Sequence, residues 1–349
     1  METAFQLPGR RPLRMATGTA LCLAISFALD LPIPVIAPVF AAFLLATQNR
    51  PLSLRAGVML GLVVMLTTGS GLLLVPLLRY YTIAGVLLVG LLLFLAFRYG
   101  LRGENNLVAT FLVAGLTMIS AAGTADLQVA VTVVGALVKG LLLAVLVSVL
   151  SHALFPEAAS GRAFPAARAI PADRAMLVAL RATLVVMPAW LLAMTDPASY
   201  MPIIMKSVSL GRQSCTATAR GAARELIGST LFGGLLAIAL WFALRLAVNL
   251  WMFFLWMLLF GLLVGRKLYG IAPTRYSPGF WLNSLVTMMI LLGQSVQDSV
   301  AGKDVYTAFA VRMGLFLAVT LYACLMLVLF DRPLGRTPPG ASDGERVST

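Results

Sequence analysis

Long apolar runs constrain this chain more than any other feature of its sequence. Residues 81–97 and 129–150, for example, contain almost no charged side chain. About 20 consecutive apolar residues are enough for a helix to cross the hydrocarbon core of a bilayer. Charged residues make up only 11% of the chain, whereas soluble domains average roughly 25%. The sequence therefore predicts an all-α, polytopic membrane protein with no sizeable soluble domain.

The placement of basic residues predicts the orientation of the chain. Most of the 26 Lys and Arg residues fall in loops on the side shared by both termini, and only Arg79, Arg245 and Lys303 fall on the other side. Positively charged loops stay in the cytoplasm, so we expect both termini to be cytoplasmic. The net charge of +13 then reflects topology. It does not form the clustered surface that a nucleic-acid partner requires. The predicted spans are 13–30, 32–48, 56–77, 81–97, 106–121, 127–153, 175–195, 199–213, 225–244, 247–265, 278–295 and 304–330.

An internal repeat relates the two halves of the chain. When the sequence is aligned with itself so that Arg14 meets Arg181, Gly61 meets Gly228. Small slips add the pairs Asp30 and Asp196, Pro34 and Pro202, Gln48 and Gln213, and Arg79 and Arg245. Six spans per half predict two parallel repeats related by a pseudo-twofold axis along the membrane normal. The expected divisions are a first repeat at 1–154, a cytoplasmic linker at 155–173, a second repeat at 174–331 and a disordered cytoplasmic tail at 332–349.

Proline interrupts the second span of each half. Pro34 and Pro38 lie in the first of these segments, and Pro202 lies in the second. Proline removes a helical hydrogen bond, and matching interrupted segments in two halves often mark a transport site. We therefore place these three prolines on a substrate path. The alternative is a pair of short outer hairpins that are kinked only to fit the bundle.

Three cations fall within predicted spans. Lys139 and Arg312 occupy the last helix of each half, and Lys206 lies four residues after Pro202. A cation at the centre of a membrane helix is costly and is usually functional. The spans contain almost no carboxylate at this depth, so an anion is the expected partner and the three cations are expected to line its path. The alternatives are snorkelling of Lys206 and pairing of Lys139 with Asp126 or of Arg312 with Asp304.

Carboxylates near the outer helix ends are candidates for energy coupling, because a proton-driven transporter needs a titrating group on its path. They are Asp30, Asp126, Asp196 and Asp304. No phosphate-binding loop, catalytic triad or metal-ligand cluster is apparent in the sequence. We therefore expect no enzyme activity, no cofactor and no metal.

Two segments carry a resemblance to a known family. The run "LRMATGTALCLAISFALDLPIPVIAPVFAAFLLA" at residues 13–46 resembles the opening of bacterial fusaric acid resistance proteins, which are aromatic acid exporters. The segment "ELIGSTLFGGLLAIALWFAL" at 225–244 is similar to a Gly-Gly-containing part of the same family. The resemblance implies a bacterial inner-membrane protein that often works beside a periplasmic membrane-fusion adaptor. Larger relatives carry a cytoplasmic domain after each half, and this chain has only a short linker and tail.

The expected function is export of small organic anions, aromatic carboxylates above all, through a basic path between the two halves. One alternative is a passive anion channel. The other is a non-transporting membrane scaffold for a periplasmic adaptor or envelope complex. The expected partners are the lipid bilayer, a small organic anion and an adaptor, and a homo-oligomer is compatible with the sequence.

Overall fold

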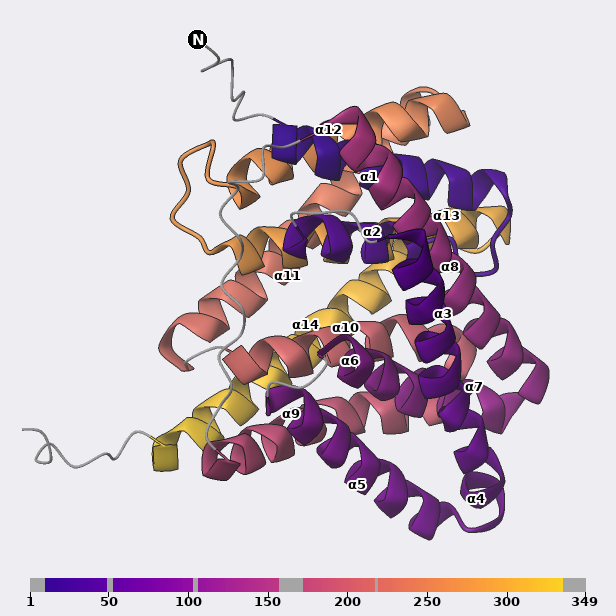
Figure 1. The fold of residues 1–349 in the computed structure, drawn as a ribbon, viewed down its shortest axis with the longest axis vertical. Coiled ribbons are helices and arrows are strands. Elements are labelled where there is room, and N and C mark those ends of the chain that lie inside the picture. Colours follow the sequence, from indigo (N-terminus) through magenta and orange to yellow (C-terminus); the bar gives the residue numbers. More distant parts are fainter. Residues whose placement is uncertain (1–9, 49–52, 103–105, 157–171, 217–218, 335–349) are drawn as a thin grey trace, which may run out of the picture.

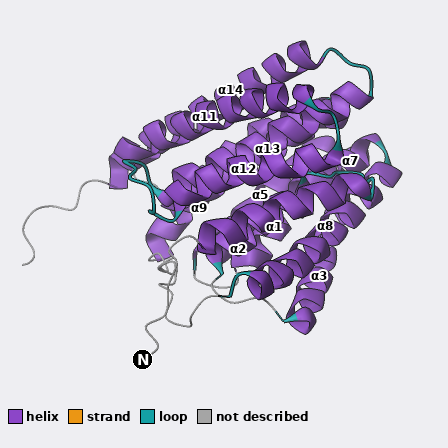
Figure 2. Ribbon diagram, turned by 90° about the horizontal axis from the view of Figure 1, so that it is seen from above, coloured by secondary structure: helices purple, strands orange, loops and turns teal. Residues whose placement is uncertain are grey.

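The computed structural model describes residues 10–48, 53–102, 106–156, 172–216 and 219–334, and helices account for nearly all of them (Figures 1 and 2). No strand is present in these ranges. The first half contains α1 (Arg10–Ala28), α2 (Ile36–Thr47), α3 (Leu54–Gly69), η1 (Ser70–Leu74), α4 (Val75–Tyr80), α5 (Thr82–Leu101), α6 (Asn106–Ala114), η2 (Gly115–Ile119), α7 (Ser120–Ala125) and α8 (Leu127–Leu154). The second half contains α9 (Ala172–Thr195), α10 (Pro197–Thr216), α11 (Ala219–Leu246), α12 (Leu250–Leu268), α13 (Pro278–Val300) and α14 (Val305–Leu334).

Each predicted span overlaps a helical segment. The third predicted span corresponds to α3, η1 and α4, which follow one another without a break, and the fifth corresponds to α6, η2 and α7. Within the described ranges, nine segments are long and apolar enough to cross a membrane. The three that fall outside this set are α1, α2 and α10; of these, α2 is a shorter apolar helix. The prediction of an all-helical, multi-pass membrane protein is confirmed. The count of twelve spans belongs to the proposal made below.

Most of the predicted linker and tail lies outside the described residues. Helix α9 begins at Ala172 and α14 continues to Leu334, so each helix takes up a few residues that had been assigned to the linker or tail.

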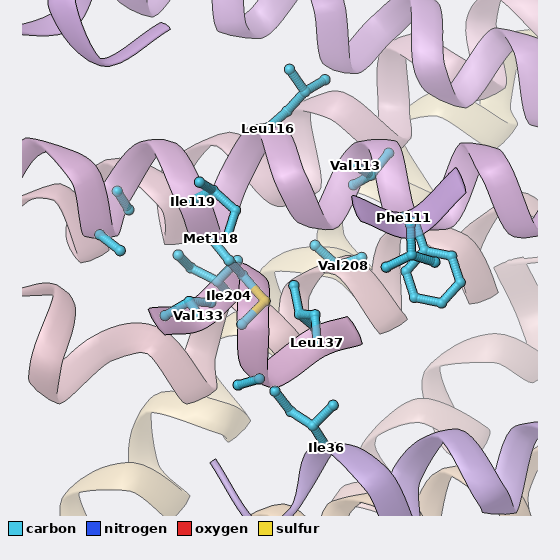
Figure 3. Packing of buried hydrophobic residues seen from close by; sticks show 14 of the residues in the cluster. Ile36, Phe111, Val113, Leu116, Met118, Ile119, Val133, Leu137, Ile204 and Val208 are labelled. Carbon is cyan, nitrogen blue, oxygen red and sulfur yellow. The ribbon is translucent and has the colours of Figure 1, made fainter. Parts of the chain in front are cut away.

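Two large hydrophobic clusters form the interior, and each draws on both halves. The first combines residues of the first half, from Cys22 of α1 to Val147 of α8, with residues of α9 and α10 such as Trp190 and Ile204. Figure 3 shows Ile204 and Val208 of α10 beside Met118, Ile119 and Leu137 of the first half. The second cluster combines α11 to α14 with residues of α1 and α2 such as Leu23 and Val39. In the described part of the chain the two halves are therefore interlocked, because each cluster contains side chains from both.

Contact between the halves also includes close packing of α1 against α12. Gly261 and Gly265, one helical turn apart on α12, allow this approach. A Cβ on Gly261 would lie 3.2 Å from Ala16 Cα, and one on Gly265 would lie 3.3 Å from Pro12 Cα. Helix α9 packs in turn against α5 of the first half. The first helix of each half thus contacts both halves, since α1 also packs on α2 and α8, and α9 also packs on α10 and α14.

The first half contains two departures from α-helical geometry. Helix η1 is a 3₁₀ segment and η2 is a π segment, and the two lie against each other. Gly71 stands at their closest approach, since a Cβ there would lie only 2.2 Å from the carbonyl oxygen of Gly115. Such interruptions are frequent at hinges and functional sites. Their counterparts α11 and α13 are continuous α-helices.

Candidate functional site

Lys206 of α10 is the central residue of the candidate site. Its side chain is 1% exposed, so it does not snorkel to the membrane surface. Its Nζ donates hydrogen bonds to Thr287 Oγ1 at 2.9 Å and to Asn283 Oδ1 at 3.5 Å. It also lies 5.9 Å from the centre of the Phe316 ring. Among the described residues, no carboxylate forms an ion pair with Lys206.

The amide of Asn283 is oriented by a further hydrogen bond. Asn283 Nδ2 donates to Ser229 Oγ at 2.6 Å, which turns Oδ1 toward Lys206. Asn283 and Thr287 are four residues apart on α13 and therefore share one face of that helix. The site is thus assembled from α10, α11, α13 and α14. All four are helices of the second half. The sequence predicted Lys206 on a path between the two halves, but the residues that contact its ammonium group all belong to the second half.

Helix α10 separates the site from the first half. Ile204 and Val208 pack into the first cluster, as Figure 3 shows. Lys206 lies between them in sequence and points instead toward α13 and α14. The repeat predicted from the sequence aligns Lys206 with Val39 or a neighbour, and Val39 is buried in the second cluster. Val39 therefore supplies no cation comparable to Lys206.

The prediction that Lys139 is buried is wrong. Its side chain is exposed near the middle of α8. It lies in line with Leu142 and Leu146, which are 39% and 57% exposed, because residues three and seven positions apart share a helix face. Lys139 therefore faces the surroundings of the protein. It was expected on the path beside Lys206, but the structure does not bring the two lysines together.

The prediction that Arg312 has no carboxylate partner is also wrong. Its guanidinium forms a close ion pair through Nη1 with Asp298 Oδ2, and its Nη2 donates to Asp298 Oδ1 at 3.1 Å. The partner is not Asp304, which had been the alternative. Asp298 near the end of α13 and Arg312 near the start of α14 flank the connection between these helices, and helices joined this closely bring such positions together.

The three prolines are buried, but they interrupt less of the helices than expected. Pro34 precedes α2, and Pro38 lies in its first turn, where no intrahelical acceptor is available in any case. Pro202 lies inside α10, which continues past it to Thr216. The predicted break in the second span of the second half is therefore a proline within a continuous helix, one turn before Lys206.

The four candidate coupling carboxylates are all exposed at helix ends. Asp126 accepts from the backbone N–H of Gln128, and Asp196 accepts from that of Ser199. Asp304 accepts from the backbone of Tyr306 and from the hydroxyl of Thr307. Asp30 follows α1 with a positive φ of 47°. Three of the four carboxylates therefore serve as helix caps.

Sequence reasoning missed Asn283, Thr287, Ser229 and Asp298. A signal for the first two was present, since two hydrogen-bonding side chains four residues apart interrupt the apolar span 278–295. Arg14 and Arg181, which the repeat pairs, are 1% and 2% exposed. Both side chains are therefore enclosed by protein.

Comparison with known proteins gives one match. Residues 11–151 match the model of a protein family of unknown function (DUF2955). The matched region begins in α1 and ends within α8, and it covers less than half of the chain. No curated protein and no solved structure matches the chain significantly.

Proposed function

We propose that this chain is a twelve-span membrane transporter that moves small organic anions past Lys206. The observation that carries the proposal is the complete burial of this lysine among neutral partners. A buried charge is normally paired, and an ionisable side chain within a membrane span is by default a candidate for a substrate pathway. A transient anion supplies the missing charge.

The polar groups around Lys206 suit an anion that comes and goes. Thr287 accepts from the ammonium group, and its own hydroxyl hydrogen can be donated to a ligand. The ring of Phe316 stabilises the cation weakly through its π-face and presents apolar surface to the body of an organic acid. Neither partner neutralises the lysine, so the attraction for an anion is retained.

The packing of helices supports two repeats of six spans. In the first half α1 packs on α2, α2 on α8, and α3 on α8. Their counterparts in the second half are α9 on α10, α10 on α14, and α11 on α14, and these pairs also pack. The exchanged contacts correspond as well, since α1 meets α12 as α9 meets α5. This correspondence is expected for parallel repeats about an axis along the membrane normal.

The proposal includes the orientation of the chain in the membrane and the direction of transport. The start of α1 and the end of α14 both lie toward the left of Figure 1, which is consistent with an even number of spans. The distribution of basic residues favours cytoplasmic termini. The resemblance to fusaric acid resistance proteins favours efflux across a bacterial inner membrane, beside a periplasmic adaptor.

The test is counterflow of benzenesulfonate, which stays ionised, in liposomes that contain the purified chain. Replacing Lys206 with Met should lower the flux about tenfold or more, because one charge-assisted hydrogen bond is worth about 1.5–3 kcal/mol. Lys139→Met is the matched control, since that lysine is also mid-helix but exposed, and it should leave the flux unchanged. Equal fluxes for wild type and Lys206→Met would overturn the proposal.

The same preparation separates the alternatives. Uphill movement that an imposed ion gradient drives identifies a transporter, whereas strictly downhill movement identifies a passive anion channel. A scaffold would give no flux in any arm.

A further inference from the structure

Arg312 and Asp298 form another charged site among the described residues of the second half. Their side chains are 13% and 6% exposed, and both oxygens of the carboxylate contact the guanidinium. Arginine presents two parallel N–H groups that fit the two oxygens of one carboxylate. Any organic carboxylate or sulfonate offers the same pair of oxygens. The guanidinium of Arg312 is therefore shaped for the ligand class proposed for Lys206.

The position of this pair relates it to the Lys206 site. Arg312 and Phe316 are four residues apart on α14 and so lie on one face, one turn from each other. The ring of Phe316 lies 5.9 Å from Lys206 Nζ. Arg312 thus lies one turn beyond Phe316 along α14, toward the end of the bundle where α13 and α14 are connected.

We infer that Arg312 is a second anion subsite and that Asp298 occupies it as an internal stand-in for the transported anion. The inference rests on the proposed function and adds an order of events to it. An anion released from Lys206 takes the place of the Asp298 carboxylate on Arg312 and then leaves at that end of the bundle. When the site is empty, Asp298 returns and keeps Arg312 from attracting other anions.

The exposed connection between α13 and α14 lies next to the Asp298 carboxylate in sequence and can receive it when it is displaced. Asp298 lies two residues before the end of α13, and the connection that follows it, residues 301–304, is exposed. Lys303 lies in that connection with its side chain exposed, and its backbone N–H donates to the Asp298 carbonyl at 2.9 Å. In the proposed displacement, the Asp298 side chain rotates toward water and Lys303.

Binding of benzenesulfonate to the purified full-length chain tests this inference in the Lys206→Met background, which removes the first site. Asp298→Asn should tighten the apparent Kd about tenfold or more, because apparent affinity scales with the fraction of the site that is free. The further change Arg312→Gln should abolish that gain. Unchanged affinity in Asp298→Asn would overturn the inference and show that the pair is a structural link between α13 and α14 only.

A double variant that removes both charges serves as the test if Asp298→Asn alone fails to fold. The double variant Asp298→Asn with Arg312→Gln, in the presence of Lys206, leaves no unpaired charge between α13 and α14. Counterflow at least about tenfold below wild type supports the second subsite, by the same loss of a charge-assisted contact, and wild-type counterflow overturns it. Failure of the proposed function is a separate result, since it appears as Lys206-independent flux.

Discussion

Trp190 of α9 donates a hydrogen bond from Nε1 to Ser120 Oγ of α7 at 3.1 Å, and so joins the two halves of the chain. Both side chains are fully buried. Trp190→Phe removes the donor and part of the ring, and it should lower the free energy of unfolding by about 1–3 kcal/mol. Thermal unfolding in detergent measures this loss.

The control for this variant is Trp251→Phe. Trp251 is 73% exposed on α12, where it stacks on Phe254, and its replacement should leave the stability nearly unchanged. Equal destabilisation by the two variants would contradict an interlocked core that depends on Trp190.

Thr287→Val should reduce transport without disturbing the fold. Valine has the shape of threonine but cannot accept the hydrogen bond from Lys206 Nζ. The lysine would then keep only the longer contact with Asn283, and the anion would lose a hydroxyl donor. We expect the counterflow of benzenesulfonate to fall about tenfold, in line with the loss of one hydrogen bond to a charged group.

Val208→Thr is the reverse control for this substitution. It adds a hydroxyl on the opposite face of α10, in the first hydrophobic cluster. It should lower stability but leave the counterflow of benzenesulfonate unchanged. A fall in counterflow equal to that of Thr287→Val would indicate a general loss of packing around α10 and not a role at the site.

The sequence was sufficient to predict which segments are helices, since runs of apolar residues near 20 in length leave few alternatives in a membrane. It also identified Lys206, because a lysine within an apolar span is conspicuous. It did not predict the direction in which each cation points. Lys139 and Lys206 look alike in sequence, and only the rotation of α8 and α10 about their axes makes one exposed and the other buried.

The partner of Arg312 was missed for a different reason. Asp304 lies close to Arg312 on the same chain segment, and it was therefore the alternative partner that the sequence offered. The pair with Asp298 forms between two antiparallel helices, and such a contact depends on the length and course of their connection. The packing of α1 on α12 and of α9 on α5 was not predicted either, because such contacts depend on how the helices are arranged in three dimensions.

Asp304→Asn should not change the pH dependence of transport. A hydrogen bond from the Thr307 side chain lowers the pKa of the Asp304 carboxyl below its ordinary value. A carboxyl with a lowered pKa favours the folded state above its unfolded pKa, and this contribution is lost as the pH falls through the folded pKa. An aspartate carboxyl ordinarily has a pKa of about 3.9, and the pKa of Asp304 is lower still. Asp304 is therefore ionised throughout the range of about pH 5–8 and takes up no proton there. Counterflow across this range measures the profile, and a profile that flattens in Asp304→Asn would show that this carboxyl carries the coupling proton.

Gly71→Ala should be strongly destabilising, whereas Gly69→Ala, two residues earlier, should not. The added Cβ at position 71 would lie 2.2 Å from Gly115 O, a backbone atom that cannot move aside without shifting η2. Overpacking of this kind costs about 1–3 kcal/mol or more. At Gly69 the Cβ would meet nothing within 4 Å, and alanine favours a helix by up to about 1 kcal/mol over glycine. Thermal unfolding of the two variants should therefore shift in opposite directions, and a similar shift for both would contradict the close crossing of η1 and η2.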